Sequence, residues 1–477
     1  MGLFTNLYQV IVDLIQSIYN IFWADLVTVP LPGGGELGLS LMVLILLPAA
    51  VFFAIRTRFM SIRLLPEMAR LSVEKNQNSE KGAISGFQTL IVSTATRVGM
   101  GNMAGVVAAV SVGGAGAVFW MWLMAILGAA MAYVEATLAQ MYKEKDPLYG
   151  GYRGGPAQYI HAFFTKGKTK RYHLIAVLFA ISGLICWGGI SQVIGNSVSE
   201  AFYNAFHIPT IVSTSVLVVL AAIVVLRKNA TVKVLDILVP IMAVIYFVAS
   251  IVIIVMNLDL VPGVFARIFQ EAFGLRQVVG GGFGAVLMNG VKRGLFSNEA
   301  GSGSAPCAAA AADVDHPAKA GLFQALGVLI DTVVICTCTA MIMLLAPADL
   351  LEGLGGMTLL QTAMNHHFGF VGVVFIAITL WLFCFSTFLG ILFYARPNLA
   401  YLFGDSWKAQ TIYKIFALVM LFIGGLATYT FVWQLGDIGI ALMTVFNMMA
   451  IIPMSGQAIK CLEDYCALRK KYKKDEK

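Results

Sequence analysis

The chain has 477 residues, of which 59% are hydrophobic and only 12% are charged. Its mean hydropathy of +0.83 is far above that of soluble globular domains, so the composition predicts an integral membrane protein. So much apolar sequence corresponds to several spans of about 20 residues, which excludes a single-span receptor. The net charge of +7 would suit a nucleic-acid-binding protein, but the Lys and Arg residues lie in the loops between apolar segments.

The first 36 residues are predicted to form an interfacial segment rather than a span. An amphipathic stretch from Leu7 to Phe22 is interrupted by Asp13 and Gln16, a pattern typical of a helix that lies in the membrane surface. The segment carries no Lys or Arg and therefore lacks the basic region of a signal peptide.

Eleven apolar stretches of about 18 residues or more follow, and each is predicted to span the membrane. Their bounds are Leu37–Ile55, Ile84–Val112, Ala115–Ala139, Leu174–Gly195, Ile208–Leu226, Leu235–Met256, Val278–Ala311, Ala320–Ala346, Phe370–Ala395, Ile412–Trp433 and Leu435–Met454. Lys and Arg gather in alternate loops and in the C-terminal tail, whereas the opposite loops hold only Arg267 and Arg276. This alternation predicts a multi-pass protein of the cell (plasma) membrane with its N-terminus outside and its C-terminus cytoplasmic.

Two of the predicted spans are interrupted by glycine and polar residues. The second contains the run from Ser93 to Gly105, and the seventh contains Gly280–Gly282 and the run from Phe296 to Ser304. Unwound backbone in a bilayer is tolerated only where protein covers it or where it lines a cavity, and the ends of half-helices suit a carboxylate and a cation. Close packing of small residues between helices is the alternative explanation of the glycines in the first run.

The positions of these interruptions indicate an inverted repeat. When the first span is set aside, the other ten form two sets of five, and an interrupted segment begins each set. An odd number of spans per set forces the halves into opposite orientation, a design that many secondary transporters share. We predict repeats at residues 84–257 and 258–455, preceded by an extra helix and loop at 37–83 and followed by a basic tail at 456–477.

Other polar residues also fall within the predicted spans. Gln192 in one repeat and the pair Ser386 and Thr387 in the other could line one cavity, although a hydroxyl that bonds its own helix is the alternative. The charged residues are Arg97, Glu135, Glu299 and Asp331, with Lys292 and Arg293 close by. Ion pairing of Arg97 or Arg293 with one of the glutamates is the structural alternative to a transport role. Asp331 has no obvious partner in the sequence, so a cation or proton role is our hypothesis.

The seven cysteines indicate packing rather than disulfides or metal binding. None lies in a predicted outer loop, so a disulfide framework is not expected. Cys336 and Cys338 share an apolar segment with no His or further Cys nearby, so we expect no metal site there.

Four motifs resemble those of the alanine or glycine:cation symporter family of sodium:alanine symporter-like amino-acid carriers. They are Arg97–Val106, Phe119–Trp122, Gly154–Ala157 and Arg293–Gly301, and the resemblance covers the chain after the first span. It implies an all-α polytopic membrane protein with about 11 transmembrane helices, in which one extra helix precedes a leucine-transporter-like five-plus-five inverted repeat. It further implies sodium-coupled import of a small neutral amino acid, alanine or glycine, by a protein that is not an enzyme and uses no cofactor.

The resemblance also assigns roles to individual residues. The residues expected to bind the amino acid are Thr94, Gly99, Gly101, Asn102, Gln192, Thr387 and Ile391. Sodium, the expected coupling ion, is a hard cation that suits oxygen ligands. Its expected ligands are the carbonyls of Ala95 and Val98 and the hydroxyls of Ser386 and Thr387. Candidate coupling or hinge residues are Glu135, Asn298, Glu299 and Asp331.

One departure from the family pattern concerns the substrate pocket. Where Phe-Ser-Thr-Ile-Leu-Gly is usually followed by Trp, this chain has Ile391 after Gly390. Isoleucine is smaller than tryptophan and lacks its N–H group, so a larger neutral amino acid such as glutamine is an alternative substrate. A non-transporting amino-acid sensor is another alternative. A channel would need a ring of pore charges, and a hydrolase is disfavoured because the sequence contains neither HExxH nor GxSxG.

Overall fold

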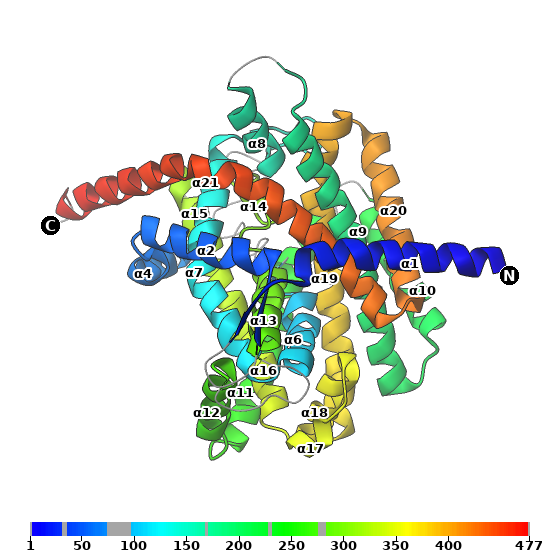
Figure 1. Ribbon diagram of the computed structural model, residues 1–477. Coiled ribbons are helices and arrows are strands. Elements are labelled where there is room, and N and C mark those ends of the chain that lie inside the picture. The colour runs from blue at the N-terminus through cyan, green and yellow to red at the C-terminus, as the bar shows by residue number, and fades with distance from the viewer. Residues whose placement is uncertain are drawn as a thin grey trace.

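The computed structural model describes residues 2–30, 36–73, 97–166, 170–227, 231–274 and 283–475. Helices make up nearly all of this part of the chain and pack into one bundle (Figure 1). The exceptions are two short antiparallel hairpins, one of β1 (Asp25–Pro30) with β2 (Glu36–Ser40) and one of β3 (Glu144–Lys145) with β4 (Tyr152–Arg153). The predicted helical class is therefore confirmed.

The helices of the first half are α1 (Gly2–Trp23), α2 (Leu41–Arg56), α3 (Met60–Arg63), α4 (Leu65–Val73), the π-helical turn η1 (Gly101–Gly105), α6 (Val106–Gly113), α7 (Gly116–Met141), α8 (Pro156–Thr165), α9 (Leu174–Phe206), α10 (Thr210–Val225), α11 (Thr231–Met256) and α12 (Val261–Ala272). The helices of the second half are α13 (Phe283–Asn298), α14 (Pro306–Ala309), α15 (Pro317–Leu329), the π-helical turn η2 (Ile330–Cys336), α16 (Thr337–Leu344), α17 (Ala348–Leu351), α18 (Gly356–Phe368), α19 (Phe370–Phe403), α20 (Trp407–Leu426) and α21 (Tyr429–Asp475).

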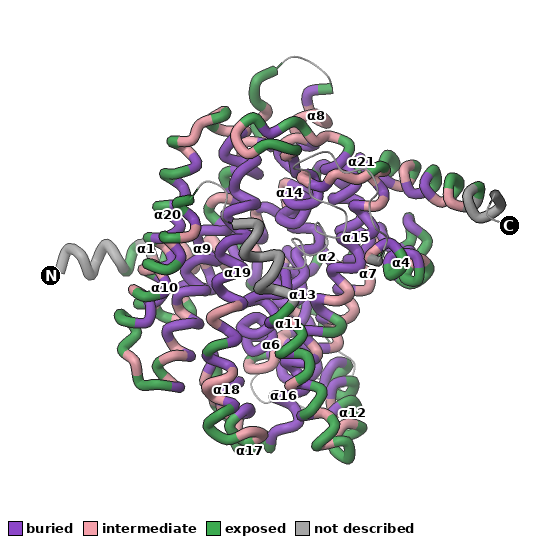
Figure 2. The backbone as a smooth tube through the Cα atoms, turned by 180° about the vertical axis from the view of Figure 1, so that it is seen from behind, coloured by how far each residue is buried: buried purple, intermediate pink, exposed green. Residues whose placement is uncertain are grey.

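Six of the described helical segments are long and apolar enough to cross a bilayer: α7, α9, α15 with η2 and α16, α19, α20 and α21. The end of α11 and α12, bent by 103°, add a seventh crossing if they count as one span. Large apolar side chains such as Ile211, Val219 and Val244 are exposed on α10 and α11, as expected of a surface that faces lipid (Figure 2). The chain is therefore a polytopic membrane protein.

The last helices do not follow the predicted span boundaries. The apolar stretch from Ile412 to Trp433 contains a turn, because α20 ends at Leu426 and α21 begins at Tyr429. The two residues of the turn, Ala427 and Thr428, are neither charged nor Gly or Pro, so hydropathy does not reveal it. Helix α21 then continues without interruption for 47 residues, well beyond the predicted span Leu435–Met454.

The N-terminal helix exists as predicted but is longer and is anchored on the bundle. It runs across α21 in Figure 1. Trp23 at its end is 1% exposed, and the indole N–H donates to the carbonyl of Asp437 at 3.1 Å. The helix therefore packs against protein at this end, and its location at the membrane surface stays a prediction.

Helices α7 and α9 lie at the centre of the bundle. α9 packs against α19, α20 and α21, while α7 packs against α13 and α15. Glycines permit the closest crossings: a Cβ atom on Gly189 of α9 would lie 2.7 Å from the backbone nitrogen of Gly436 in α21. Within this frame η1, α6, α13 and η2 contact one another. The two interrupted segments are thereby brought together in the interior.

Candidate functional site

The backbone is interrupted at both predicted places. The first described helical residues bend at Val98 and Gly99, and the chain continues as the π-helical turn η1. In the second segment α13 ends at Asn298, and the chain resumes as a helix only at Pro306. Between them Glu299, Gly301 and Gly303 have positive φ angles of 58°, 93° and 83°. In this second segment Gly301 and Gly303 supply backbone conformations that other residues rarely adopt, which agrees with the sequence signal there.

The two interrupted segments touch at Gly101 and Ser297. A Cβ atom on Gly101 would lie 3.1 Å from the Cα atom of Ser297, so any side chain there would force the segments apart. Asn102, the next residue, has its amide nitrogen 3.5 Å from the Ser297 hydroxyl. The glycine thus permits the contact, and the polar side chains lie directly beside it.

Thr387 of α19 contacts the first interrupted segment. Its hydroxyl accepts a hydrogen bond from the backbone N–H of Met100 at 3.0 Å and donates to the carbonyl of Phe383 at 2.9 Å. A Cβ atom on Gly99 would collide with this hydroxyl. The neighbouring Ser386 donates to the same carbonyl at 2.8 Å. Both hydroxyls bond their own helix, and that of Thr387 also reaches the bend.

A polar cluster, which we call the Asp331 cluster, joins both interrupted segments to η2. It consists of Asn102, Ser297, Asp331 and Thr332, all at most 2% exposed. The Asp331 carboxylate accepts hydrogen bonds from the Asn102 amide at 2.8 Å, the Ser297 hydroxyl at 2.8 Å and the Thr332 hydroxyl at 2.9 Å. The other end of the Asn102 amide accepts from the backbone N–H of Gly99 at 2.8 Å. Asn102 therefore links the bend to the buried carboxylate.

Among the described residues, the side chains that donate to Asp331 are all neutral. Arg97 is 2% exposed and uses one terminal nitrogen to donate to the carbonyl of Gln324 at 3.0 Å. Its remaining terminal nitrogen and its Nε atom have no hydrogen-bond partner among the described residues. Within the same part of the chain, no three His, Cys, Asp or Glu side chains are grouped to hold a transition metal. The Asp331 cluster is a set of buried oxygen atoms with one negative charge, which suits a hard cation.

Glu135 belongs to a second network, beside the second interrupted segment. Its carboxylate accepts from the backbone N–H of Gly301 at 3.1 Å and from the side-chain amide of Asn447 in α21. Asn447 in turn accepts from the hydroxyl of Tyr159 in α8 at 2.6 Å and donates to the Gly301 carbonyl at 3.0 Å. Glu135 thus connects α7, the interrupted segment and α21.

Glu299 and Asn298 lie within that segment. The Glu299 carboxylate accepts from the hydroxyl of Tyr394 in α19 at 3.1 Å. The side-chain oxygen of Asn298 accepts from the backbone N–H of Ala300 at 3.0 Å and so forms a turn just beyond the end of α13. Both residues are buried and stabilise the break itself, which agrees with a hinge but does not require a ligand.

The far end of the segment is bonded to Gln140 of α7 and to Lys143, two residues beyond the end of α7. Gln140 donates to the Ala312 carbonyl at 2.9 Å, and the ammonium group of Lys143 donates to the same carbonyl at 2.9 Å. Partial burial lowers the pKa of Lys143 from its ordinary value. The carbonyls beyond α14 are therefore satisfied by side chains, which fixes this end of the break.

The structural alternative in which Arg293 pairs with Glu135 or Glu299 is not what the structure shows. Arg293 forms a bidentate pair with Asp437 of α21, with N–O distances of 2.9 and 3.0 Å. Lys292 is 3.5 Å from the same carboxylate. The sequence pattern did not single out Asp437, although an aspartate inside an apolar stretch is itself a signal of a buried partner.

The remaining predicted residues are placed as follows. Gln192 donates to the sulfur of Met420 in α20 at 3.4 Å, and its side-chain oxygen is buried without a hydrogen-bond partner among the described residues. Ile391 is 2% exposed and lies one turn beyond Thr387 on α19, and Val98 is 1% exposed. Thr94 and Ala95 lie outside the described residues.

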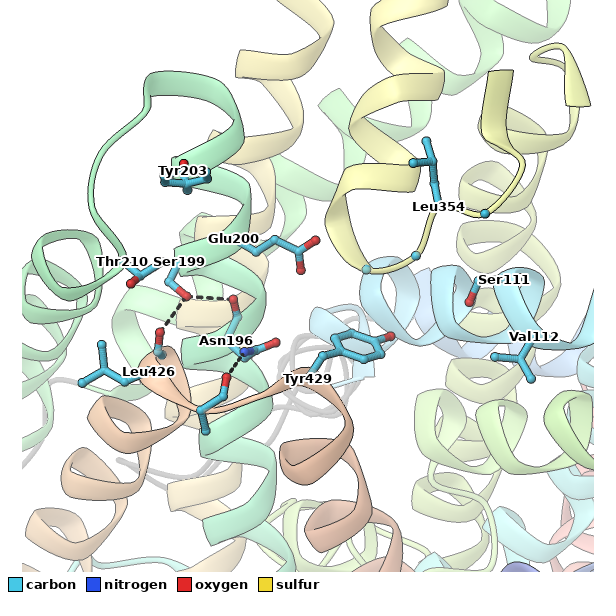
Figure 3. A pocket seen from close by; sticks show the side chains of 15 residues that line it. Ser111, Val112, Asn196, Ser199, Glu200, Tyr203, Thr210, Leu354, Leu426 and Tyr429 are labelled. Atoms are coloured by element: carbon cyan, nitrogen blue, oxygen red, sulfur yellow. Dashed lines mark hydrogen bonds between the residues drawn. The ribbon is translucent and has the colours of Figure 1, made fainter. Parts of the chain in front are cut away.

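A cavity of about 730 Å³ opens between α6, α9, α18 and the turn that joins α20 to α21. Glu200 and Tyr429 point into it from α9 and α21, and Ser111 faces them from α6 (Figure 3). Glu200 also accepts from the backbone N–H and the hydroxyl of Thr358, both at 3.1 Å, and so ties the first turn of α18 to α9. Glu200 lies in a predicted loop, where a carboxylate is common, so no sequence pattern singles it out.

The sequence matches the model of the sodium:alanine symporter family over residues 35–477. It is 40% identical over 433 residues to the probable sodium/glutamine symporter GlnT of Bacillus subtilis, with 90% of this chain and 89% of that protein covered. It is 35% identical over 434 residues to the sodium/alanine symporter AgcS of Methanococcus maripaludis, with 90% and 95% covered.

Two solved structures are similar in fold. MhsT in complex with L-phenylalanine has a TM-score of 0.53 at 12% identity, with 77% of this chain and 89% of that chain covered. A manganese transporter of Eremococcus coleocola, in complex with an aromatic bis-isothiourea substituted compound, has a TM-score of 0.52 at 12% identity, with 81% and 80% covered. At this identity the likeness shows the fold alone, that of leucine-transporter-type carriers.

Proposed function

Because the chain belongs to the sodium:alanine symporter family, we propose that it carries a small neutral amino acid, alanine or glycine, into the cell together with sodium. Membership makes it a membrane transporter of the sodium/amino-acid symporter class and not an enzyme. In this proposal the amino acid and sodium are its transported partners, and neither a cofactor nor a nucleic acid takes part.

The proposed architecture has eleven spans, with α2 as the extra helix before inverted repeats at residues 84–257 and 258–455. The N-terminus is outside and the basic tail, 456–477, is cytoplasmic. Two observations support this arrangement: the chain breaks near the start of each proposed repeat, and the two breaks contact each other in the interior. Paired interruptions at a repeat interface are the usual place for a substrate and a coupling ion.

The Asp331 cluster is the observation that carries the proposal. A buried carboxylate that receives only neutral hydrogen bonds is unfavourable, and a bound cation compensates its charge. The cluster joins three elements, so a cation bound there stabilises the arrangement in which they meet. We propose that Asp331 couples amino-acid transport to the entry of a cation. Sodium is the first candidate for this cation and a proton is the second.

The amino acid is proposed to bind where the first interrupted segment meets α19. In the structure Asn102 and Thr387 occupy the backbone N–H groups of Gly99 and Met100, and the substrate carboxylate would exchange with these side-chain oxygens. The buried, unpartnered oxygen of Gln192 is an acceptor available to the substrate. The other proposed contacts are with Thr94, Gly101 and Ile391.

A sodium site beside this substrate site would use the carbonyls of Ala95 and Val98 and the hydroxyls of Ser386 and Thr387. The contact of Thr387 with the bend supports this placement, because it brings α19 within hydrogen-bond distance of the first interrupted segment. Asn102 supports a link to Asp331, because its amide bonds both the bend and the carboxylate. Occupancy of one site would therefore alter the other, as symport requires.

A larger neutral amino acid is the second candidate substrate. Ile391, which is buried, is proposed to line the pocket in place of a tryptophan, and a relative at 40% identity is a probable sodium/glutamine symporter. A sensor that binds the amino acid without transporting it would use the same residues.

Uptake by purified protein in liposomes separates these candidates. Radiolabelled alanine, glycine and glutamine are offered under an inward sodium gradient, an inward proton gradient, or neither, with protein-free liposomes as the control. Accumulation driven by sodium alone supports the proposed symport, and the label that accumulates most identifies the substrate. Sodium-dependent binding without accumulation would identify a sensor and overturn the transport proposal.

A further inference from the structure

A separate cavity of about 250 Å³ lies where the end of α2 and α3 meet the far half of α21. Arg56, Arg58 and Arg63 line it from one side, and α21 contributes Leu462 and Glu463 from the other. The lining side chains therefore carry an excess of two positive charges. Nothing in the proposed transport path uses this cavity.

Exposed apolar side chains surround the arginines. Ile55, Phe59, Ile62 and Leu65 are 59%, 46%, 63% and 43% exposed. Helix α2 has 16 residues and is thus about 24 Å long, shorter than the roughly 30 Å hydrocarbon core of a bilayer. A short apolar helix draws lipid headgroups inward toward its end, or reaches them with long basic side chains. Arginines beside exposed apolar residues at such an end lie at the level of the headgroups.

The backbone that positions these arginines is strained. Arg58 and Phe59 have positive φ angles of 56° and 51°. They close the end of α2, where the N–H of Phe59 donates to the carbonyl of Ala54 at 2.7 Å. Glycine is the residue that usually occupies such a helix end, because it adopts this conformation without strain. An arginine held in this strained conformation, where glycine would close the helix without strain, points to a function for its side chain.

Contacts between α4 and α21 next to the cavity hold its two sides in place. Glu67 of α4 is 4% exposed and accepts from the hydroxyl of Tyr465 in α21 at 2.7 Å. It also pairs with Arg70 at 3.1 Å and with Arg469 of α21. The cavity is therefore bounded by elements in defined positions and can select a ligand by shape as well as by charge.

We propose that this cavity binds the phosphodiester headgroup of an anionic phospholipid. The guanidinium groups face the phosphate, for which arginine is well suited because its N–H groups form paired hydrogen bonds. The apolar residues around the cavity lie against the acyl chains. The cavity of about 250 Å³ is large enough to admit a phosphate group. The proposed topology places the site in the cytoplasmic leaflet, where basic clusters meet anionic lipid.

Lipid binding to the full-length protein in neutral detergent tests the proposal. Thermal melting and native mass spectrometry are recorded with added phosphatidylglycerol, phosphatidylcholine, or sodium phosphate at matched phosphate concentration. We expect phosphatidylglycerol to raise the melting temperature more than the other two. The key variant is Arg58→Gly, which removes a phosphate ligand but relieves the backbone strain. It should melt no lower than wild type without lipid, yet bind phosphatidylglycerol about tenfold more weakly.

Arg171→Gln is the matched control, because Arg171 is an exposed arginine outside the cavity and on the same predicted side of the membrane. It should keep the full response to phosphatidylglycerol. The proposal is overturned if Arg58→Gly binds phosphatidylglycerol as wild type does, or if Arg171→Gln loses the response equally. An equal response to sodium phosphate would assign the cavity to free phosphate and overturn the lipid assignment. None of these readouts depends on transport, so the proposed function is tested separately.

Discussion

Replacing Asp331 with asparagine removes the buried charge and nearly preserves its shape. One carboxylate oxygen accepts from Asn102 at 2.8 Å, and the other accepts from Ser297 at 2.8 Å and Thr332 at 2.9 Å. The new asparagine side chain has a single oxygen. In its better orientation this oxygen keeps the hydrogen bonds from Ser297 and Thr332, and the hydrogen bond from Asn102 is lost. Such a loss costs about 1–3 kcal/mol, and removal of a buried charge that receives only neutral hydrogen bonds from the described residues offsets it. We therefore expect only a small change in the free energy of unfolding of the sodium-free protein.

The effect on the cation should be much larger. A unit charge about 4 Å from the carboxylate gains about 4 kcal/mol at an effective dielectric constant of about 20. Loss of that interaction corresponds to a weakening of cation binding on the order of 10³-fold. The half-saturating sodium concentration for uptake and for thermal stabilisation should rise steeply in Asp331→Asn. Asp349→Asn, at an exposed position in α17, is the control and should behave as wild type.

The same variant also separates the two candidate cations. If Asp331 accepts a proton instead of sodium, the pH profile of uptake should flatten in Asp331→Asn while the sodium dependence is kept. Unchanged sodium half-saturation together with an unchanged pH profile and rate would refute the assignment of Asp331 to coupling.

Three further substitutions test other parts of the site. Ile391→Trp should narrow selection toward glycine and alanine, because the larger ring fills the proposed pocket; competition of each label with unlabelled glutamine measures this. Gly99→Ala should reduce uptake at least tenfold, because the added Cβ atom collides with the Thr387 hydroxyl and separates the bend from α19. Arg293→Met should lower the free energy of unfolding by about 3–5 kcal/mol, because it leaves Asp437 buried beside only a more distant lysine.

Each of these has an outcome that contradicts it. Equal uptake of large and small substrates by Ile391→Trp and wild type would remove position 391 from selectivity. Gly456→Ala is the control for Gly99, because a Cβ atom at Gly456 meets nothing within 4 Å; equal activity of both variants would show that the close contact is dispensable. For the ion pair, the double variant Arg293→Met with Asp437→Leu should recover part of the lost stability. A double variant less stable than Arg293→Met would show that Asp437 has a role beyond pairing.

The sequence predicts the interruptions well because their cause is local. Glycine and polar residues inside an apolar stretch cannot continue a buried helix without cost, and the chain does break around Gly99 and between Asn298 and Pro306. The sequence left the partner of Arg293 open because several acids lie within buried spans, and only the helix packing decides which carboxylate faces the guanidinium. A break in a helix can be predicted from the local sequence, whereas the partner of a buried charge is determined by how the helices pack.

The partners of Asp331 were not predicted for the same reason. Asn102 of η1 and Ser297 at the end of α13 are far from Asp331 in sequence, and the close contact between Gly101 and Ser297 brings these two partners together. The apolar turn between α20 and α21 was missed for the opposite reason, since its residues carry no signal that distinguishes them from a helix.

The side-chain amide of Asn102 links the proposed substrate site to the proposed cation site. A carboxamide is planar, with its acceptor and its donor fixed on opposite edges, and here the acceptor faces the N–H of Gly99 while the donor faces Asp331. A rotation that frees the Gly99 N–H for a substrate carboxylate therefore also withdraws the donor from Asp331. The carboxylate then loses a neutral hydrogen bond at the moment the substrate arrives, which makes a bound cation more favourable there. Amino acid and cation would each stabilise the arrangement that the other needs, and neither occupies it well alone.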